Sequence, residues 1–175
     1  MTRKRIHRPT LRRAACALIA GSLAAATAGF ANAQAQPLTP EQARHLVAPF
    51  YAMLNQPATK NLVELADAVI APDWRSLGSD GEAKTREAFV EQLRGAGKLI
   101  PDLRWEIAEI LISGNQVVVR GEASGTPIGP FLGLPASGRS FRIMSIDIHT
   151  VKDGKLVAVH HVEDWATAVR QLTPR

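Results

Sequence analysis

The sequence of 175 residues contains a single cysteine, Cys16, which lies near the N-terminus. If the segment that carries Cys16 is removed, the remaining chain can form no disulfide, no thiolate metal site and no cysteine nucleophile. The sequence also lacks a Gly-rich phosphate loop, a dinucleotide-binding fingerprint and a Gly-x-Ser-x-Gly elbow. These absences argue against nucleotide-dependent enzymes and α/β-hydrolases.

Acidic residues are absent from the first 33 positions, which hold six of the 21 Lys and Arg residues. The following residues carry the other 15 basic and all 16 acidic side chains, a formal charge of −1 against +5 for the whole chain. The basic excess therefore lies entirely in the N-terminal segment. A nucleic-acid-binding domain needs a basic surface of its own, so no nucleic-acid partner is expected.

The N-terminal segment has the three parts of a secretory signal. Basic residues precede an apolar stretch over 14–30, and Ala31-Asn32-Ala33 forms a small-x-small cleavage site, with Ala33-Gln34-Ala35 as an alternative. A retained membrane anchor is the other interpretation, but the stretch is shorter than the ~20 residues of a spanning helix. We expect residues 1–33 to be a signal peptide and residues 34–175 to be one periplasmic or secreted domain. No membrane contact is expected after cleavage.

Apolar residues with helical spacing mark the first half of this domain. The spacing predicts one helix over 39–54, opened by a capping box, and a second over 62–70. Pro and Gly residues then predict a break and a turn. A third helix is expected to start near Thr85 and to fray at Gly95 and Gly97.

After the third helix, the period of the apolar residues changes to that of a strand. The pattern predicts four strands and a short final helix, over 103–112, 116–124, 139–151, 155–164 and 165–172. A change of apolar phase near Ala108-Glu109 predicts a bulge in the first strand. Helices followed by consecutive strands indicate an α+β fold, with the helices on one face of a curved antiparallel sheet.

The last two strands carry most of the polar residues that could perform chemistry. If Asp153-Gly154 forms a two-residue turn and the pairing continues without a bulge, Asp147 lies opposite His160. Four polar residues then share one face of the hairpin: Asp147, His149, His160 and Asp164. A three-residue turn with a bulge would separate the first two from the last two.

Two histidines and a carboxylate would suit iron or zinc, so a metal site is an alternative interpretation of His149, His160, His161 and Asp147. Adjacent residues of a strand point to opposite faces, however, which separates His160 from His161. The sequence also has no pair of histidines on one helix face. We therefore expect neither a metal nor another cofactor.

Several short motifs of the domain occur in a known order and spacing. They lie at 98–105 (Lys-Leu-Ile-Pro-Asp-Leu-Arg-Trp), 125–133, 136–139, 153–156, 160–165 and 171–172. With these motifs, the chain resembles the SnoaL-like polyketide cyclases, also called ester cyclases, over roughly residues 42–172.

The resemblance implies the nuclear transport factor 2-like fold, in which three helices cover the concave side of a bent sheet and enclose an apolar pocket. Cyclases of this family close a ring by intramolecular aldol condensation without cofactor or metal, and a single aspartate serves as acid and base. The motifs match that aspartate to Asp164. A pocket histidine of the family corresponds best to His149.

These residues suggest a mechanism on a hydrophobic carbonyl compound. Burial would raise the pKa of Asp164, so that its carboxylate takes a proton next to the carbonyl. His149 or His160 would donate a hydrogen bond to the enolate, and Asp147 would orient an imidazole. Aromatic residues of the core or pocket wall are the candidate substrate contacts: Tyr51, Trp74, Trp105 and Phe131.

Three functions fit these expectations. The first is an exported enzyme, a cofactor-free lyase or isomerase. The second is an exported protein that binds a hydrophobic ligand without chemistry. The third is a structural module that pairs through the convex face of its sheet. The expected partners are a small hydrophobic molecule and a second copy of the chain in a homodimer.

Overall fold

The computed structural model describes residues 38–78 and 81–174. In these ranges the chain forms helices and strands in the order α1 (Pro40–Leu54), η1 (Pro57–Thr59, a 3-10 helix), α2 (Leu62–Val69), β1 (Ile70–Leu77), β2 (Ala83–Thr85), α3 (Arg86–Leu99), β3 (Arg104–Ser113), β4 (Gln116–Gly125), β5 (Phe141–Lys152), β6 (Lys155–Glu163) and α4 (Trp165–Leu172). None of the described helices is long and apolar enough to cross a membrane. The predicted signal peptide and both cleavage sites lie outside the described residues.

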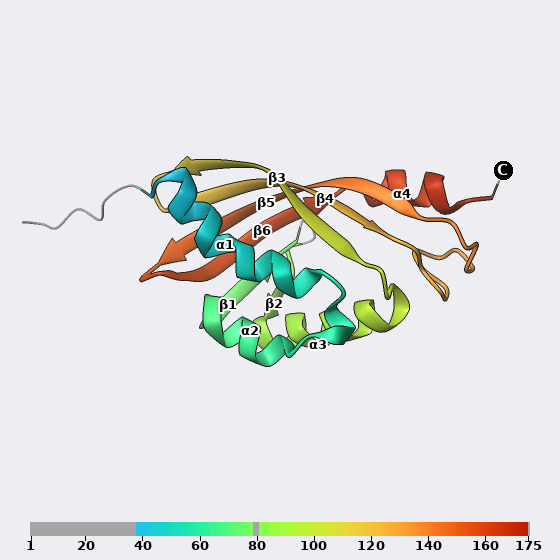
Figure 1. Ribbon diagram of the computed structural model, residues 1–175, viewed down its shortest axis with the longest axis horizontal. Helices are drawn as coiled ribbons and strands as arrows, with labels where there is room; N and C mark the ends of the chain where they lie inside the picture. The colour runs from blue at the N-terminus through green and yellow to red at the C-terminus, as the bar shows by residue number, and fades with distance from the viewer. Residues whose placement is uncertain (1–37, 79–80, 175) are drawn as a thin grey trace, which may run out of the picture. The chain divides into compact units, whose positions relative to one another are not determined.

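The strands form one six-stranded sheet in the order β2-β1-β6-β5-β4-β3 (Figure 1). Neighbouring strands are antiparallel except β1 and β6, which are parallel. The sheet is therefore mixed, and the prediction of a purely antiparallel sheet is wrong at this pairing. The sequence predicts only a break after the second helix where β1 lies, because Pro72 ends a helical pattern. Pro72 also hides the strand, since it cannot donate a ladder hydrogen bond. Pairing of β1 with β6 is irregular between Ile70 and Arg75, which accommodates Pro72.

Side-chain capping defines the start of α1, and packing against η1 explains why α3 contains glycine. The predicted capping box is present at α1: Gln42 N–H donates to Thr39 Oγ1 at 3.2 Å, and Thr39 N–H donates to Gln42 Oε1 at 2.9 Å. The predicted fraying of α3 is wrong, since the helix continues through both glycines to Leu99. A Cβ on Gly97 would lie 2.5 Å from the backbone N of Ala58, so this glycine lets α3 pack closely against η1.

Helices α1, α2 and α3 lie on one side of the sheet (Figure 1). Apolar side chains of these helices and of the inner sheet face form the core, among them Val47, Phe50, Met53, Phe89, Val119 and Leu156. The predicted bulge in β3 is present, since pairing with β4 shifts between Ile107 and Glu109. The predicted α+β architecture, with helices on one face of the sheet, is confirmed.

Candidate functional site

The hairpin of β5 and β6 has a register that decides which polar residues face the helices. The predicted two-residue turn is present, with Lys152 opposite Lys155. Val157 is then skipped by the pairing, and from Thr150 onward every pair is shifted by one residue. This is a β-bulge, which the predicted uninterrupted register does not contain.

Because of the bulge, Asp147 lies opposite His161 rather than the predicted His160, and Ser145 lies opposite Glu163. Residues of the hairpin that face the helices are Ser145, Asp147, His149, Val159, His161 and Glu163. The predicted common face of Asp147, His149, His160 and Asp164 is therefore wrong. A shift of one residue turns every later side chain of β6 to the other side of the sheet.

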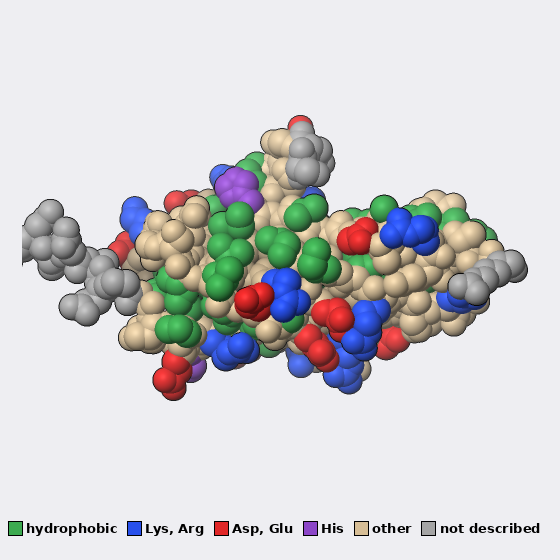
Figure 2. Space-filling view, turned by 90° about the horizontal axis from the view of Figure 1, so that it is seen from above, with side chains coloured by type: hydrophobic (Ala, Val, Ile, Leu, Met, Phe, Trp, Pro, Cys, Tyr) green, Lys and Arg blue, Asp and Glu red, His purple; other side chains and the backbone are tan. Residues whose placement is uncertain are grey.

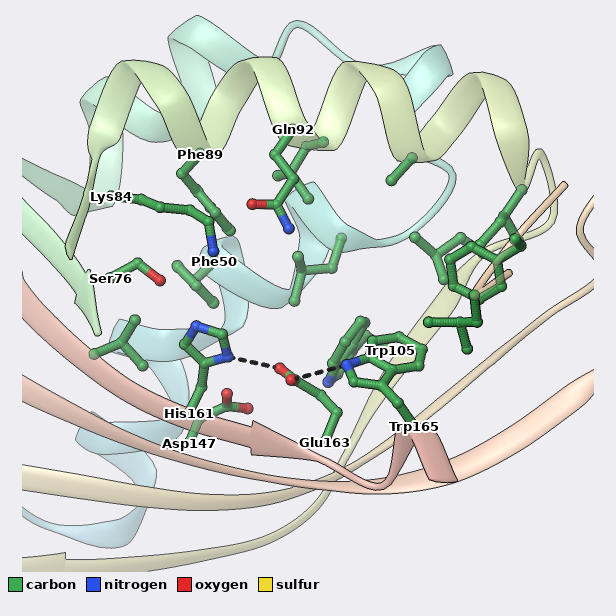
Figure 3. A pocket seen from close by; sticks show the side chains of 18 residues that line it. Phe50, Ser76, Lys84, Phe89, Gln92, Trp105, Asp147, His161, Glu163 and Trp165 are labelled. Atoms are coloured by element: carbon green, nitrogen blue, oxygen red, sulfur yellow. Dashed lines mark hydrogen bonds and ion pairs between the residues drawn. The ribbon is translucent and has the colours of Figure 1, made fainter. Parts of the chain in front are cut away.

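A cavity of about 360 Å³ lies between α3, the inner face of the sheet and the loop after β4 (Figure 3). Most of its lining is apolar and includes Phe89, Leu93, Ile100, Trp105, Phe131 and Trp165. Six polar side chains also line it: Ser76, Lys84, Gln92, Asp147, His161 and Glu163. Among the described residues, no group of three or more His, Cys, Asp or Glu could hold a metal ion. The cavity thus combines a hydrophobic interior with a few polar groups, as in small-molecule sites.

His161, Glu163 and Trp165 form a chain of contacts along the cavity wall (Figure 3). Nδ1 of His161 lies 2.8 Å from Oε1 of Glu163, and the indole N–H of Trp165 donates to Oε2 at 3.2 Å. The hydrogen bond to Glu163 outweighs burial and raises the pKa of His161. Since Nδ1 is engaged with Glu163, Nε2 is the ring nitrogen left to contact a ligand.

Asp147 is a buried carboxyl group, with 5% of its surface exposed. Tyr51 of α1 donates its hydroxyl hydrogen to Oδ2 of Asp147 at 2.8 Å. Burial raises the pKa of Asp147 to about 6, although the hydrogen bond from Tyr51 opposes the rise. A carboxyl group with this pKa can both take and give a proton near neutral pH.

Behind Asp147, His149 extends this contact into a buried chain of hydrogen bonds. Nε2 of His149 lies 3.1 Å from the Tyr51 hydroxyl, while Nδ1 has no partner among the described residues. When Asp147 is ionised, His149 Nε2–H donates to Tyr51, and Tyr51 donates to Asp147. In either direction Nδ1 is a buried atom without a partner among the described residues, an acceptor in this one and an N–H donor in the reverse one. Burial lowers the pKa of His149 to about 3, which keeps its ring neutral.

Trp105 is held against the cavity by polar contacts at both ends. Asn55, just after α1, accepts a hydrogen bond from Trp105 N–H at 2.6 Å and donates to Trp105 C=O at 3.3 Å. The indole N–H of Trp105 donates to Ser145 Oγ at 3.0 Å. A Cβ on Gly121 would lie 2.7 Å from that oxygen, so glycine leaves room for the contact.

Of the four aromatic residues predicted to contact a substrate, two line the cavity, Trp105 and Phe131. Phe131 belongs to the loop after β4 and packs edge-to-face on Trp165, with ring centroids 5.8 Å apart. Tyr51 and Trp74 are core residues, 2% and 0% exposed, and do not line the cavity. Tyr51 influences the cavity through its hydrogen bond to the buried carboxylate.

Asp164 and His160 lie outside the cavity lining. Asp164 is exposed and caps α4, where its carboxylate accepts hydrogen bonds from the hydroxyl of Thr167 at 2.5 Å and from its backbone N–H at 2.9 Å. These two bonds lower the pKa of Asp164. His160 is exposed on the other face of the sheet. The predicted placement of both residues in a pocket is therefore wrong, because the bulge at Val157 rotates β6.

Five polar residues of the lining are not predicted to line a pocket: Ser76, Lys84, Gln92, His161 and Glu163. His161 enters the sequence analysis only in the alternative of a metal site. A predicted register with the bulge at Val157 would have placed His161 and Glu163 on the inner face of the sheet. Gln92 follows Phe89 by three residues, so helical spacing could have assigned it to the inner face of α3. Ser76 and Lys84 lie on β1 and β2, which carry no strand signal.

The chain resembles known proteins in sequence and in fold. The sequence profile of the SnoaL-like polyketide cyclases matches residues 45–172. The chain belongs to this family. No curated protein matches the sequence.

Solved structures of similar fold cover most of the SnoaL-like chain. TsrD from Streptomyces laurentii is 27% identical with a TM-score of 0.67, and the match covers 77% of this chain and 97% of TsrD. IdmH from Streptomyces antibioticus is 25% identical with a TM-score of 0.65, over 75% of this chain and 98% of IdmH. A SnoaL-like protein from Jannaschia sp. CCS1 shares the fold at 21% identity, with a TM-score of 0.68 over 80% and 99% of the two chains. These similarities confirm the predicted family and the nuclear transport factor 2-like fold.

Proposed function

We propose that this SnoaL-like protein transfers protons on a small hydrophobic carbonyl compound, with Asp147 as general acid and base and His161 as hydrogen-bond donor. The observation that carries the proposal is the cross-strand pairing of these two side chains on one wall of a largely apolar cavity. Membership of a polyketide cyclase family supports aldol ring closure, or a related lyase or isomerase reaction, as the chemistry.

The burial of Asp147 suits it to proton abstraction from carbon. A base must be ionised at the working pH and still be basic enough to accept the proton. With a pKa of about 6, Asp147 is mostly ionised at neutral pH and is roughly a hundredfold more basic than an ordinary aspartate. The exposed Asp164 has a lowered pKa and is the weaker base of the two.

His161 supplies the complementary group. Its raised pKa favours the protonated ring, with Nδ1 toward Glu163 and Nε2–H available for a carbonyl oxygen. A positioned donor of this kind stabilises the negative charge of an enolate by about 3 kcal/mol. Glu163 and Trp165 fix the orientation of the donor.

An aldol ring closure can be written with these two groups. The Asp147 carboxylate takes a proton from the carbon beside a carbonyl, and the electron pair of the C–H bond forms an enolate. The enolate carbon attacks a second carbonyl carbon of the same molecule, which forms the new C–C bond and an alkoxide. The alkoxide takes the proton from Asp147, while His161 keeps its own proton and stabilises the enolate oxygen.

Deuterium uptake tests the proton-transfer step without knowledge of the natural substrate. A bicyclic aromatic ketone such as 2-tetralone, incubated with the protein in D₂O, should gain deuterium beside its carbonyl faster than in buffer, as measured by mass spectrometry. Asp147→Asn should lower the catalysed rate by about 10²- to 10⁴-fold. If the unmodified protein binds the ketone but never accelerates uptake, the proposal fails and the alternative of an exported ligand-binding protein is favoured.

We also propose export to the periplasm or the medium, supported by the basic, apolar and small-residue parts of positions 1–33. N-terminal sequencing of the exported protein should begin at Gln34, or at Gln36 if the second site is cut. An intact N-terminus on protein from the cytoplasm alone would contradict export.

The outer face of the sheet supports a further proposal, a homodimer. Figure 2 looks onto this face, where hydrophobic side chains gather beside Lys, Arg, Asp and Glu. Leu111, Met144 and Val162 are more than half exposed there, at 59%, 53% and 55%. Exposed apolar side chains that gather on one face are typical of protein contacts, and a second copy of the chain would cover them.

A further inference from the structure

A basic and a hydroxyl side chain both line the side of the cavity away from Trp165 (Figure 3). β1 and β2 pair so that Ser76 lies opposite Lys84, and both residues line the cavity. Figure 3 shows the Lys84 ammonium group pointing inward beside Ser76. Ser76 is only 3% exposed, so its hydroxyl is enclosed by protein and faces the cavity.

Contacts within the described part of the chain do not account for this arrangement. Neither Lys84 nor Ser76 has a side-chain hydrogen bond or ion pair with another described residue. The other charged groups of the cavity are Asp147, His161 and Glu163, of which the last two already pair with each other. Lys84 is exposed, so folding does not require a counter-ion for it. Its direction toward an enclosed, unpaired hydroxyl points instead to a ligand.

We propose that Lys84 and Ser76 form an anion subsite, and that the ligand is a hydrophobic ring compound with a carboxylate at one end. This rests on the proposed function, because it names the substrate class of the same cavity. The carboxylate would accept hydrogen bonds from the Lys84 ammonium group and the Ser76 hydroxyl. The ring system would lie against the apolar side chains of α3 and the loop, such as Phe89 and Phe131. Its carbonyl oxygen would reach His161, and the carbon beside the carbonyl would reach Asp147.

Two probes that differ in charge alone test the subsite. Pyrene-1-butyrate and its methyl ester share one ring system, and their binding is measured by fluorescence anisotropy at low ionic strength. The protein should bind the carboxylate about tenfold more tightly than the ester, and Lys84→Met should remove this preference with ester binding changed by less than about twofold. Added salt should weaken binding of the carboxylate and leave that of the ester unchanged.

Lys98→Met is the matched control, because Lys98 is an exposed lysine of α3 outside the cavity lining. This variant should keep the preference for the carboxylate. Equal affinities of the unmodified protein for both probes would overturn the subsite, as would an equal loss of preference in the Lys84 and Lys98 variants. The apolar cavity and the proposed function would survive either result. If neither probe binds, the cavity does not take hydrophobic ligands, and the proposed function fails together with the subsite.

Discussion

The two sides of the β5–β6 hairpin carry the same kinds of side chain in different surroundings. Asp147 and His161 face the cavity, whereas His160 faces outward and Asp164 caps α4 in solvent. Burial raises the pKa of Asp147 to about 6, while hydrogen bonds from Thr167 lower the pKa of Asp164. The hydrogen bond to Glu163 raises the pKa of His161. The proton affinities that the proposed function needs therefore belong to side chains of the inner face.

A single residue separates these two outcomes. Pairing skips Val157, and this turns His161 rather than His160 toward the helices. Successive residues of a strand face opposite sides, so one extra residue exchanges the inner and outer sets. The chemistry of the cavity therefore depends on a backbone irregularity as much as on which residues the strand contains.

The largest expected effect concerns the inner His149, whose pKa in the folded protein is about 3. The unfolded chain binds the proton near pH 6.5, so this residue stabilises the fold above that pH and loses its contribution as the pH falls toward 3. Burial of Asp147 acts in the opposite sense, since it favours the folded state at low pH. Between pH 7 and pH 4, His149→Gln should retain about 3 kcal/mol more of its unfolding free energy than the unmodified protein. Urea titrations measure this change.

His160→Gln is the control on the outer face, because its imidazole is exposed. This variant should follow the unmodified protein at both pH values. Equal acid sensitivity of the His149 and His160 variants would contradict the difference between the two faces.

The next largest effect concerns the adjacent histidines of β6. His161→Gln removes the proposed hydrogen-bond donor beside Asp147 and should slow deuterium uptake by 2-tetralone about 10²-fold. His160→Gln should leave the rate within about twofold, since its side chain does not reach the cavity. Equal losses in both variants would mean that the faces do not differ in catalysis.

A smaller effect is expected at Tyr51, which acts on the cavity through a hydrogen bond. Tyr51→Phe leaves Asp147 and His149 without their shared partner and should lower the unfolding free energy by about 1–3 kcal/mol. That bond lowers the pKa of Asp147, so its loss should move the acid limb of the rate profile to higher pH. A loss of stability with an unchanged pH profile would reduce Tyr51 to a packing residue.

The smallest effect on catalysis is expected on the outer face. Val162→Glu places a charge in the exposed apolar surface and should convert the proposed homodimer to monomer in analytical ultracentrifugation, with deuterium uptake changed by less than about twofold. A protein that sediments as a monomer before mutation would contradict the proposed dimer.

Local sequence signals predict the helices and most of the sheet because they act over a few residues. The capping box of α1, the bulge in β3 and the two-residue turn between β5 and β6 are all present. β1 escapes prediction because its pairing with β6 joins segments about 80 residues apart, and Pro72 hides the strand pattern. The glycines of α3 wrongly predict a frayed helix for a similar reason. The close contact of Gly97 with η1 is made only in the folded chain, so local sequence cannot show it.

The site is predicted less well than the fold. Trp105 and Asp147 are found, because they lie on strands whose inner face is apolar, and Phe131 is found as an aromatic residue of the loop after β4. His161 and Glu163 are not predicted to face the cavity, since no residue type around Val157 indicates a bulge there. A resemblance of motifs fixes the order of residues along the chain, but the side of the sheet on which each residue lies depends on register.

The most direct test compares Asp147→Asn with Asp164→Asn in the deuterium-uptake assay. The two substitutions are identical, and asparagine can cap α4 as aspartate does. We predict that Asp147→Asn lowers the catalysed rate by at least about 10²-fold and that Asp164→Asn leaves it within about twofold. A large loss in Asp164→Asn, with Asp147→Asn close to the unmodified protein, would contradict the account.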